Sequence, residues 1–114
     1  MEECIFCRIA AGEIPCRKVY EDDSVLAFDD IQPMAPVHVL IIPKVHVATV
    51  MDVDAARMAN LAAMMEAAQK VAILKGVEQS GFRLVINCHR EGGQVIFHLH
   101  MHLLGGQQLR NALN

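Results

Sequence analysis

Residues 94–106, QVIFHLHMHLLGG, decide the fold and the chemistry that this sequence can support. If residues 95–104 form a strand, successive side chains point to opposite faces of a sheet. One face then carries His98, His100 and His102, and the other carries Phe97, Leu99, Met101 and Leu103. The apolar face is expected to be buried in the core, so the histidine face must look onto a polar site.

The three histidines fit a functional site better than a buried structural role or a purification tag. Three buried rings would each need partners, because an unpaired polar group costs about 1 to 3 kcal/mol. A purification tag would be a contiguous terminal run, unlike this internal alternation. A zinc site made of all three rings stays open, since histidines at alternate strand positions can converge on one ion.

The pattern His-φ-His-φ-His-φ-φ, with φ apolar, is matched at every position by residues 98–104. Three further segments precede this pattern: CIFCRIAAGEIPCRKVYEDD, LAFDDIQPMAPVHVLIIPKVH and FRLVINCHREGGQ. All four motifs occur together, and in the same order, in one known family. With Gly105 and Gly106 after the histidines, the chain resembles the histidine triad (HIT) family, and within it the Hint-like branch of nucleoside phosphoramidases. The resemblance covers nearly the whole chain.

Length and composition exclude several classes of protein. The 114 residues fit a single domain, 1–114, and the formal net charge of −3 without a basic cluster argues against a nucleic-acid surface. No run of about 18 apolar residues predicts a membrane span, and the acidic N-terminus is unlike a signal peptide. We therefore expect a cytoplasmic protein, in which the four cysteines are thiols or metal ligands.

Local patterns predict the elements before the histidine strand. A short helix is expected over residues 4–11, ended by Gly12. Residues 18–20 and 25–29 should form a hairpin, residues 31–37 a proline-containing loop, and residues 37–43 a third strand.

One long helix and a fourth strand are predicted after residue 50. Asp52 and Asp54 can cap the helix, which should end near Lys75 before Gly76. Its apolar stripe is expected to consist of Met58, Leu61, Ala62, Met65 and Ala72, and core packing is expected for Met64 as well. The fourth strand should span residues 82–87.

These elements predict the α+β class: a five-stranded antiparallel sheet with one long and one short helix packed on one face. The family resemblance implies in addition a homodimer, in which two subunits form one ten-stranded sheet. Such a join would cover an exposed sheet edge.

The chemistry of the three histidines follows from their order. Imidazole titrates near neutrality and is a good nucleophile towards phosphorus. His100 has a histidine two residues away on each side, so it is the best candidate nucleophile. The resemblance implies that it attacks the α-phosphate of a nucleotide. His102 would contact the phosphate, either as a general acid for the leaving amine or through a positioning hydrogen bond.

The remaining binding residues are assigned to a purine nucleotide, AMP or GMP-like. Asn87 and the backbone N–H groups near Gly93 and Gln94 could donate to the phosphate, with a structural turn as the alternative for Asn87. The resemblance implies that Asp30 binds the ribose hydroxyls. It also implies an apolar wall for the base: Ile5, Phe6, Ile9, Phe28 and Ile31.

A Cys-x-x-Cys pair, Cys4 and Cys7, is a weak signal for a metal by itself. The resemblance implies that His46 and His98 complete a tetrahedral structural Zn²⁺ site, which would leave His100 and His102 for catalysis. Free thiols and hydrogen-bonded histidines are the alternative. Cys16 and Cys88 lack partners at ligand spacing.

The predicted function is a nucleotide hydrolase that cleaves purine nucleoside 5′-phosphoramidates, of the adenosine 5′-monophosphoramidase type, through a nucleotidyl-histidine intermediate. The alternatives are a dinucleoside polyphosphate hydrolase and a nucleotide-binding or scaffold protein with vestigial activity. One departure from the Hint-like pattern is Val95, where those sequences commonly carry a serine or threonine. The tail QQLRNALN also lacks the aromatic and proline residues that some relatives use to reach the partner's active site.

Overall fold

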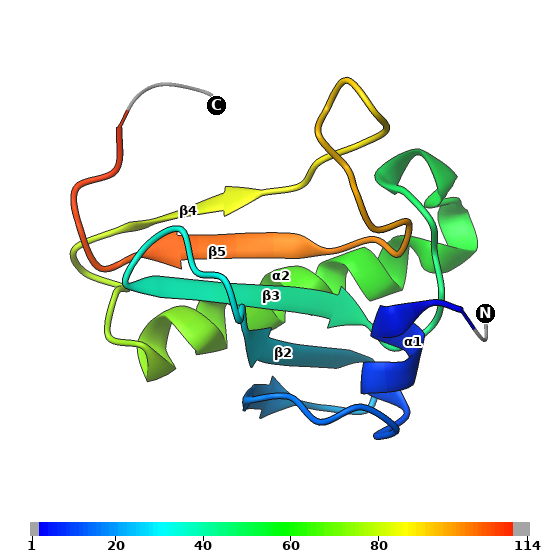
Figure 1. The fold of residues 1–114 in the computed structure, drawn as a ribbon, viewed down its shortest axis with the longest axis horizontal. Helices are drawn as coiled ribbons and strands as arrows, with labels where there is room; N and C mark the ends of the chain where they lie inside the picture. Colours follow the sequence, from blue (N-terminus) through cyan, green and yellow to red (C-terminus); the bar gives the residue numbers. More distant parts are fainter. Residues whose placement is uncertain (1–2, 111–114) are drawn as a thin grey trace.

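The computed structural model describes residues 3–110, and a five-stranded antiparallel sheet forms its centre (Figure 1). Its strands follow the spatial order β1-β2-β3-β5-β4. Their bounds are Lys18–Glu21 for β1, Val25–Asp29 for β2, Val37–Pro43 for β3, Phe82–Val85 for β4 and Met101–Gly105 for β5. The predicted fold class and number of strands are therefore confirmed.

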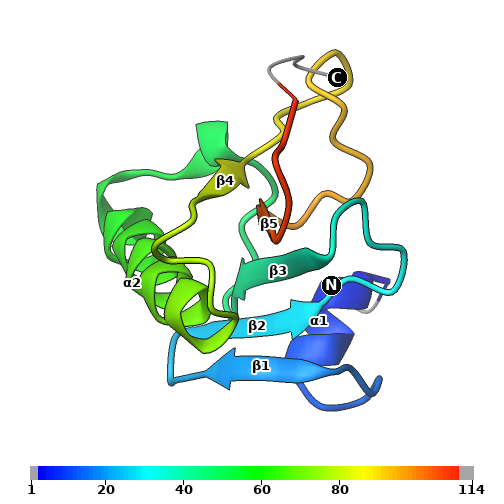
Figure 2. The same cartoon turned by 90° about the vertical axis from the view of Figure 1, so that its left-hand side faces the viewer.

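The two helices cover opposite faces of the sheet, α1 (Ile5–Ala10) on one side and α2 (Met58–Leu74) on the other (Figure 2). The prediction that both pack on one face was wrong. Alternation along β2 and β3 explains the difference, because both strands are buried on both faces. Val39 and Ile41 pack with α2, whereas Leu40 and Ile42 pack with Phe6 of α1.

Local signals correctly predicted the first third of the chain. Cys4 caps α1, its sulfur accepting from the Cys7 N–H at 3.3 Å, and Gly12 ends the helix with a φ of +81°. Asp22 closes the β1–β2 turn by accepting from the N–H groups of Ser24 and Val25, both at 2.8 Å.

The start and the buried face of α2 differ from the prediction. Two 3₁₀ turns, η1 (Val50–Asp52) and η2 (Ala55–Arg57), precede the helix. Asp54 caps η2, and Asp52 is the partner of the Thr49 cap in a capping box. The residues that α2 buries are Met64, Ala67, Ala68, Val71 and Ala72, so only Ala72 of the predicted stripe is fully buried.

The reason for this error is the composition of α2, MANLAAMMEAAQKVAIL, which has apolar residues at every angle around the axis. Such a sequence does not select one stripe by spacing. The alanines Ala67, Ala68 and Ala72 are buried in the core, and Met58 and Met65 are left about half exposed. The end of the helix is as expected, since Gly76 has a φ of +72° after the C-cap Lys75.

The histidine strand is shorter than predicted, because β5 begins at Met101 rather than at residue 95. Met101 pairs with Ile41 of β3, so continued pairing would place Leu99 opposite Pro43. Proline has no N–H to donate, and β3 ends at Pro43. Leu99 donates instead to the Val47 carbonyl, and Phe97 is half exposed rather than buried. The predicted strand 82–87 likewise ends early, at Val85.

No helix within residues 3–110 has the length and apolar character needed to cross a membrane.

Candidate functional site

A cavity of about 550 Å³ lies on the α1 face of the sheet and reaches the triad segment. All residues predicted to wall the base line it, namely Ile5, Phe6, Ile9, Phe28 and Ile31. Asp30, Asn87, Gly93, His100 and His102 line it as well. Phe6 and Phe28 are also core residues, only 4% and 5% exposed, and their rings meet edge to face.

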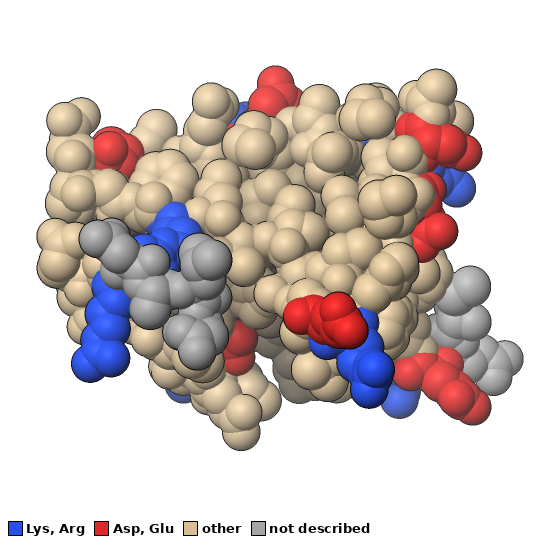
Figure 3. All heavy atoms as spheres, turned by 90° about the horizontal axis from the view of Figure 1, so that it is seen from above, with Lys and Arg blue, Asp and Glu red and all other residues tan. Residues whose placement is uncertain are grey.

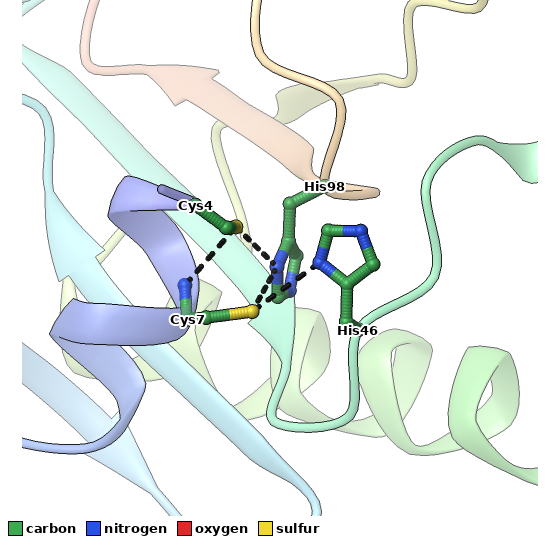
Figure 4. A group of neighbouring side chains, drawn as sticks. All are labelled: Cys4, Cys7, His46 and His98. Carbon is green, nitrogen blue, oxygen red and sulfur yellow. Dashed lines mark hydrogen bonds between the residues drawn. The ribbon is translucent and has the colours of Figure 1, made fainter. Parts of the chain in front are cut away.

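His98 faces away from the cavity and towards the two N-terminal cysteines (Figure 4). Its Nδ1 lies 3.3 Å from the Cys4 sulfur and 3.5 Å from the Cys7 sulfur, and His46 Nδ1 lies 3.2 Å from Cys7. The four ligand atoms all lie within 4.8 Å of one another. The fold therefore brings together the four residues predicted as metal ligands, although they lie far apart in the sequence.

The ring of His98 is held in the tautomer that a metal ligand needs. Its Nε2 lies 2.9 Å from the Pro43 carbonyl, which can only accept, so Nε2 carries the proton. The Nδ1 lone pair then points to the sulfur atoms. A metal-bound histidine is usually oriented by a hydrogen bond that its other ring nitrogen donates.

The thiols would have to release protons when a metal binds. Burial and the neighbouring Cys4 raise the pKa of the Cys7 thiol to about 11. Two sulfur and two nitrogen donors nevertheless suit tetrahedral zinc, so the chemistry of this cluster fits the expected ion.

His100 is oriented by the backbone of His98. Its Nδ1 lies 2.8 Å from the His98 carbonyl oxygen and must donate to it. In the neutral ring Nε2 is therefore unprotonated and holds a lone pair. The ring lines the cavity and packs edge to face against Phe6, with the ring centroids 5.2 Å apart. This arrangement provides a nucleophilic nitrogen without a separate base.

His102 is oriented by a fourth histidine, His38, which was not among the residues predicted from sequence. The Met34 N–H donates to His38 Nδ1 at 3.0 Å, so His38 carries its proton on Nε2. That nitrogen lies 2.9 Å from His102 Nδ1 and donates to it. A neutral His102 therefore has its own proton on Nε2. The alternation of His38 with Leu40 and Ile42 on the triad side of β3 was the signal that could have found it.

Burial keeps both rings of this pair neutral. It lowers the pKa of His102 to about 4, and the neighbouring His100 and His38 add to the effect. Burial also lowers the pKa of His38, against the opposing effect of Asp30. Asp30, His38 and His102 lie close together, but the His38 Nε2 proton is donated to His102 Nδ1, so neither of these two nitrogens is a free metal ligand.

The triad rings thus point to three different partners, which contradicts the alternative in which all three bind one zinc ion.

The predicted phosphate contacts are brought to the cavity only in part. Asn87 donates from its amide to the Gly92 carbonyl at 2.7 Å, so the structural alternative for this residue is present, although its side chain also lines the cavity. The N–H groups of Gly93 and Gln94 donate to the carbonyls of Arg90 and His89. Gln94 is buried and is not among the residues that line the cavity.

Few cations line the cavity. Arg17 is the one lysine or arginine among its described lining residues, which also include the carboxylates of Asp29 and Asp30. Arg17 lies beside the end of β2, since its carbonyl accepts from the Asp29 N–H. Near the triad segment the cavity is therefore lined by histidine side chains, with no described lysine or arginine among them.

Comparisons with known proteins agree with this geometry. The HIT domain model matches residues 11–109. The chain is 49% identical over 108 residues to a purine nucleoside phosphoramidase of Escherichia coli, covering 95% of this chain and 91% of the relative. It is 44% identical to the protein HitA of Neisseria gonorrhoeae, covering 92% of this chain and 97% of that protein.

Solved structures are similar over nearly their whole length. A histidine triad protein from Clostridium difficile has a TM-score of 0.95 at 46% identity, covering 98% of this chain and 97% of that one. A HIT family hydrolase from Legionella pneumophila has a TM-score of 0.93 at 49% identity, covering 96% and 97%. The chain therefore belongs to the HIT domain family, whose members include nucleotide hydrolases and phosphoramidases.

Proposed function

We propose that this protein hydrolyses purine nucleoside 5′-phosphoramidates, as an adenosine 5′-monophosphoramidase does, through a nucleotidyl intermediate on His100. The observation that carries the proposal is the hydrogen bond from His100 Nδ1 to the His98 carbonyl, which leaves Nε2 unprotonated beside an apolar cavity. The name of the E. coli relative supports the same substrate class.

In the first step, His100 Nε2 attacks the α-phosphorus, the P–N bond breaks, and the nitrogen takes up a proton so that a neutral amine leaves. In the second, water attacks the same phosphorus and loses a proton, the bond from phosphorus to His100 Nε2 breaks, and the nucleoside monophosphate is released. Each displacement is easier than direct hydrolysis. The His102 Nε2–H donates to a phosphoryl oxygen, where negative charge builds up during both steps. General-acid work by His102 would require a second proton, which the charge of the bound phosphate would favour.

The nucleoside binds on the α1 side of the cavity. Phe6, Ile9 and Phe28 provide the apolar surface for the purine, together with Ile5 and Ile31 at the rim. Asp30 accepts from the ribose hydroxyls. One of its oxygens already accepts from the Gln32 N–H at 2.9 Å, which holds the carboxylate in place.

A dinucleoside polyphosphate is the less favoured substrate. It would bring additional negative phosphates, and Arg17, on the nucleoside side, is the one lysine or arginine among the described cavity residues. A scaffold role without catalysis is also disfavoured, because the tautomers of three histidines are fixed in a way that binding alone does not need.

The substitution His100→Ala should abolish cleavage of an adenosine phosphoramidate, because it removes the attacking nitrogen. Intact-mass analysis of the unchanged protein with a slow substrate should detect one nucleotidyl adduct, which the variant lacks. As a control, His89→Asn, in the exposed loop after β4, should retain full activity. Faster turnover of a dinucleoside tetraphosphate than of the phosphoramidate would contradict the assignment.

The neutral histidines also predict a pH dependence of stability. Burial lowers the pKa values of His38, His98 and His102 in the folded chain, that of His102 to about 4 from the usual 6.5. Below about pH 6.5 the unfolded chain therefore binds more protons, so the free energy of unfolding should be largest above this pH and fall towards pH 4. Urea unfolding, in chelator and reductant throughout, measures this.

The control for this pH effect is His102→Asn, which cannot titrate. Its free energy of unfolding should depend less steeply on pH between about 6.5 and 4 than that of the unchanged protein. Parallel pH profiles for the two proteins would rule out the proposed neutral His102.

We propose further that Cys4, Cys7, His46 and His98 hold a structural Zn²⁺ ion, in a reducing, cytoplasmic setting that keeps both sulfurs available. When bound, the ion would link α1 to His98 and to the segment after β3. It takes no part in the two displacements.

Elemental analysis of protein expressed with zinc should find about one ion per chain. The double variant Cys4→Ser, Cys7→Ser should lose it, since serine is a poor zinc ligand. The matched control Cys88→Ser changes a cysteine outside the cluster and should keep the ion. Equal zinc content in both variants would refute this site.

The homodimer with a ten-stranded sheet is part of the same proposal. β4 is an edge strand with an unpaired side. Its first residue, Phe82, is an exposed apolar side chain. Figure 3, a view onto the β4 side, shows lysine, arginine, aspartate and glutamate mainly around the margin. A second copy of the chain would cover this edge.

Sedimentation should therefore give twice the chain mass of 12.6 kDa. Phe82→Glu places a charge on the edge strand and should shift the protein to the monomer, whereas Ile73→Glu, at the far end of α2, should not. A monomer for the unchanged protein at high concentration would contradict the dimer.

A further inference from the structure

The segment that carries His98 and His100 lies outside the sheet, and something else must hold it. The β3–β5 ladder begins at the pair Ile41 and Met101, so neither His98 nor His100 takes part in it. One backbone bond, from the Leu99 N–H to the Val47 carbonyl, ties the segment to the chain after β3. Together with the bond from the His98 ring to the Pro43 carbonyl, it fixes residues 98 and 99, but no described backbone-to-backbone bond holds residues 95–97.

The side chain of Gln94 supplies the missing bonds. It is only 6% exposed, and its amide nitrogen donates to the Ala48 carbonyl at 2.9 Å and to the Ile96 carbonyl at 3.0 Å. Its oxygen accepts from the His89 N–H at 2.9 Å. These partners fix the amide orientation, because two are carbonyls and one is an N–H.

These three bonds join three separate segments of backbone. His89 belongs to the loop after β4, Ala48 follows the metal-cluster residue His46 by two positions, and Ile96 precedes His98 by two. One side chain thus fixes the segment before His98 relative to the loop after β4 and to the segment after β3. Its burial makes each bond costly to lose, since an unpaired buried carbonyl costs about 1 to 3 kcal/mol.

A shift of the segment that Gln94 holds would affect His100 through the backbone. The His98 carbonyl accepts from His100 Nδ1, so a shift of residues 96–98 moves the acceptor that fixes the His100 tautomer. We propose that Gln94 is a positioning residue, which holds the His98 carbonyl where it keeps His100 Nε2 unprotonated and directed at the phosphorus. This rests on the proposed role of His100, and Gln94 itself does not line the cavity.

The test uses Gln94→Met, which is similar in shape and forms none of the three bonds. We expect kcat to fall by about a hundredfold, the loss associated with a displaced catalytic group, with KM changed by less than about twofold. KM should hold because Gln94 is not among the residues that line the cavity. Gln94→Glu keeps the bond from His89 and loses both donated bonds, so it serves if the methionine variant does not fold.

A second measurement does not depend on activity. Ring ¹⁵N shifts of His100 should report a single tautomer in the unchanged protein, with the proton on Nδ1, and a mixture of both in either variant. The matched control is Thr49→Val. Thr49 is 3% exposed and follows Ala48, and the substitution removes a buried hydroxyl that accepts from the Met51 N–H. It should lower stability but leave the tautomer and kcat unchanged.

Two results would overturn the proposal: a single Nδ1–H tautomer with kcat within about twofold of the unchanged protein in a folded Gln94 variant, or losses that Thr49→Val reproduces. If the unchanged protein cleaves no phosphoramidate, the proposed function fails, and the tautomer measurement still decides whether Gln94 positions His100.

Discussion

The hydrogen bond between His100 Nδ1 and the His98 carbonyl is the constraint on which the rest of the site depends. Imidazole has two nitrogens, and only the unprotonated one can attack phosphorus. A backbone carbonyl two residues earlier settles which nitrogen that is, without adding charge to the site. The reactivity of His100 is therefore a property of backbone placement as much as of its own ring.

His98 links this constraint to the N-terminal cluster. Its ring lies against Cys4 and Cys7, its Nε2 donates to Pro43, and its carbonyl holds His100. Phe6, between the two cysteines, packs against the rings of both His98 and His100. One short helix of six residues thus joins the cysteine cluster, the apolar wall of the cavity and the ring of His100.

Neutral charge is the second organising feature of the cavity. The chain from Met34 through His38 to His102 passes hydrogen bonds in one direction and ends in a donor at His102 Nε2. Burial keeps these rings uncharged at neutral pH, since it lowers the pKa of both His38 and His102. In the proposed reaction, these aligned dipoles would stabilise one phosphoryl group without a cation.

Much of this arrangement could be predicted from the sequence, because its signals are local. Proline and glycine mark the ends of β3 and of both helices, and alternation separates His98, His100 and His102 from the buried Leu99, Met101 and Leu103. The side of the sheet on which each helix packs could not be predicted, because β2 and β3 are apolar on both faces. The contacts that depend on tertiary structure could not be predicted from the sequence either. His38 meets His102 through the register of β3 against β5, which pairs His38 with Leu104 and Leu40 with His102. A backbone N–H near Gln94 was expected to donate to the phosphate, whereas the bonds of the buried Gln94 side chain to Ala48 and Ile96 had no signal in the sequence.

The most direct test of the central claim is the stereochemical course at phosphorus. A nucleoside phosphoramidate made chiral at phosphorus would be hydrolysed in isotopically labelled water, and the configuration of the product determined. Two successive displacements, first by His100 Nε2 and then by water, predict overall retention. Inversion would mean that water attacks the substrate directly, and it would remove His100 from the role of nucleophile.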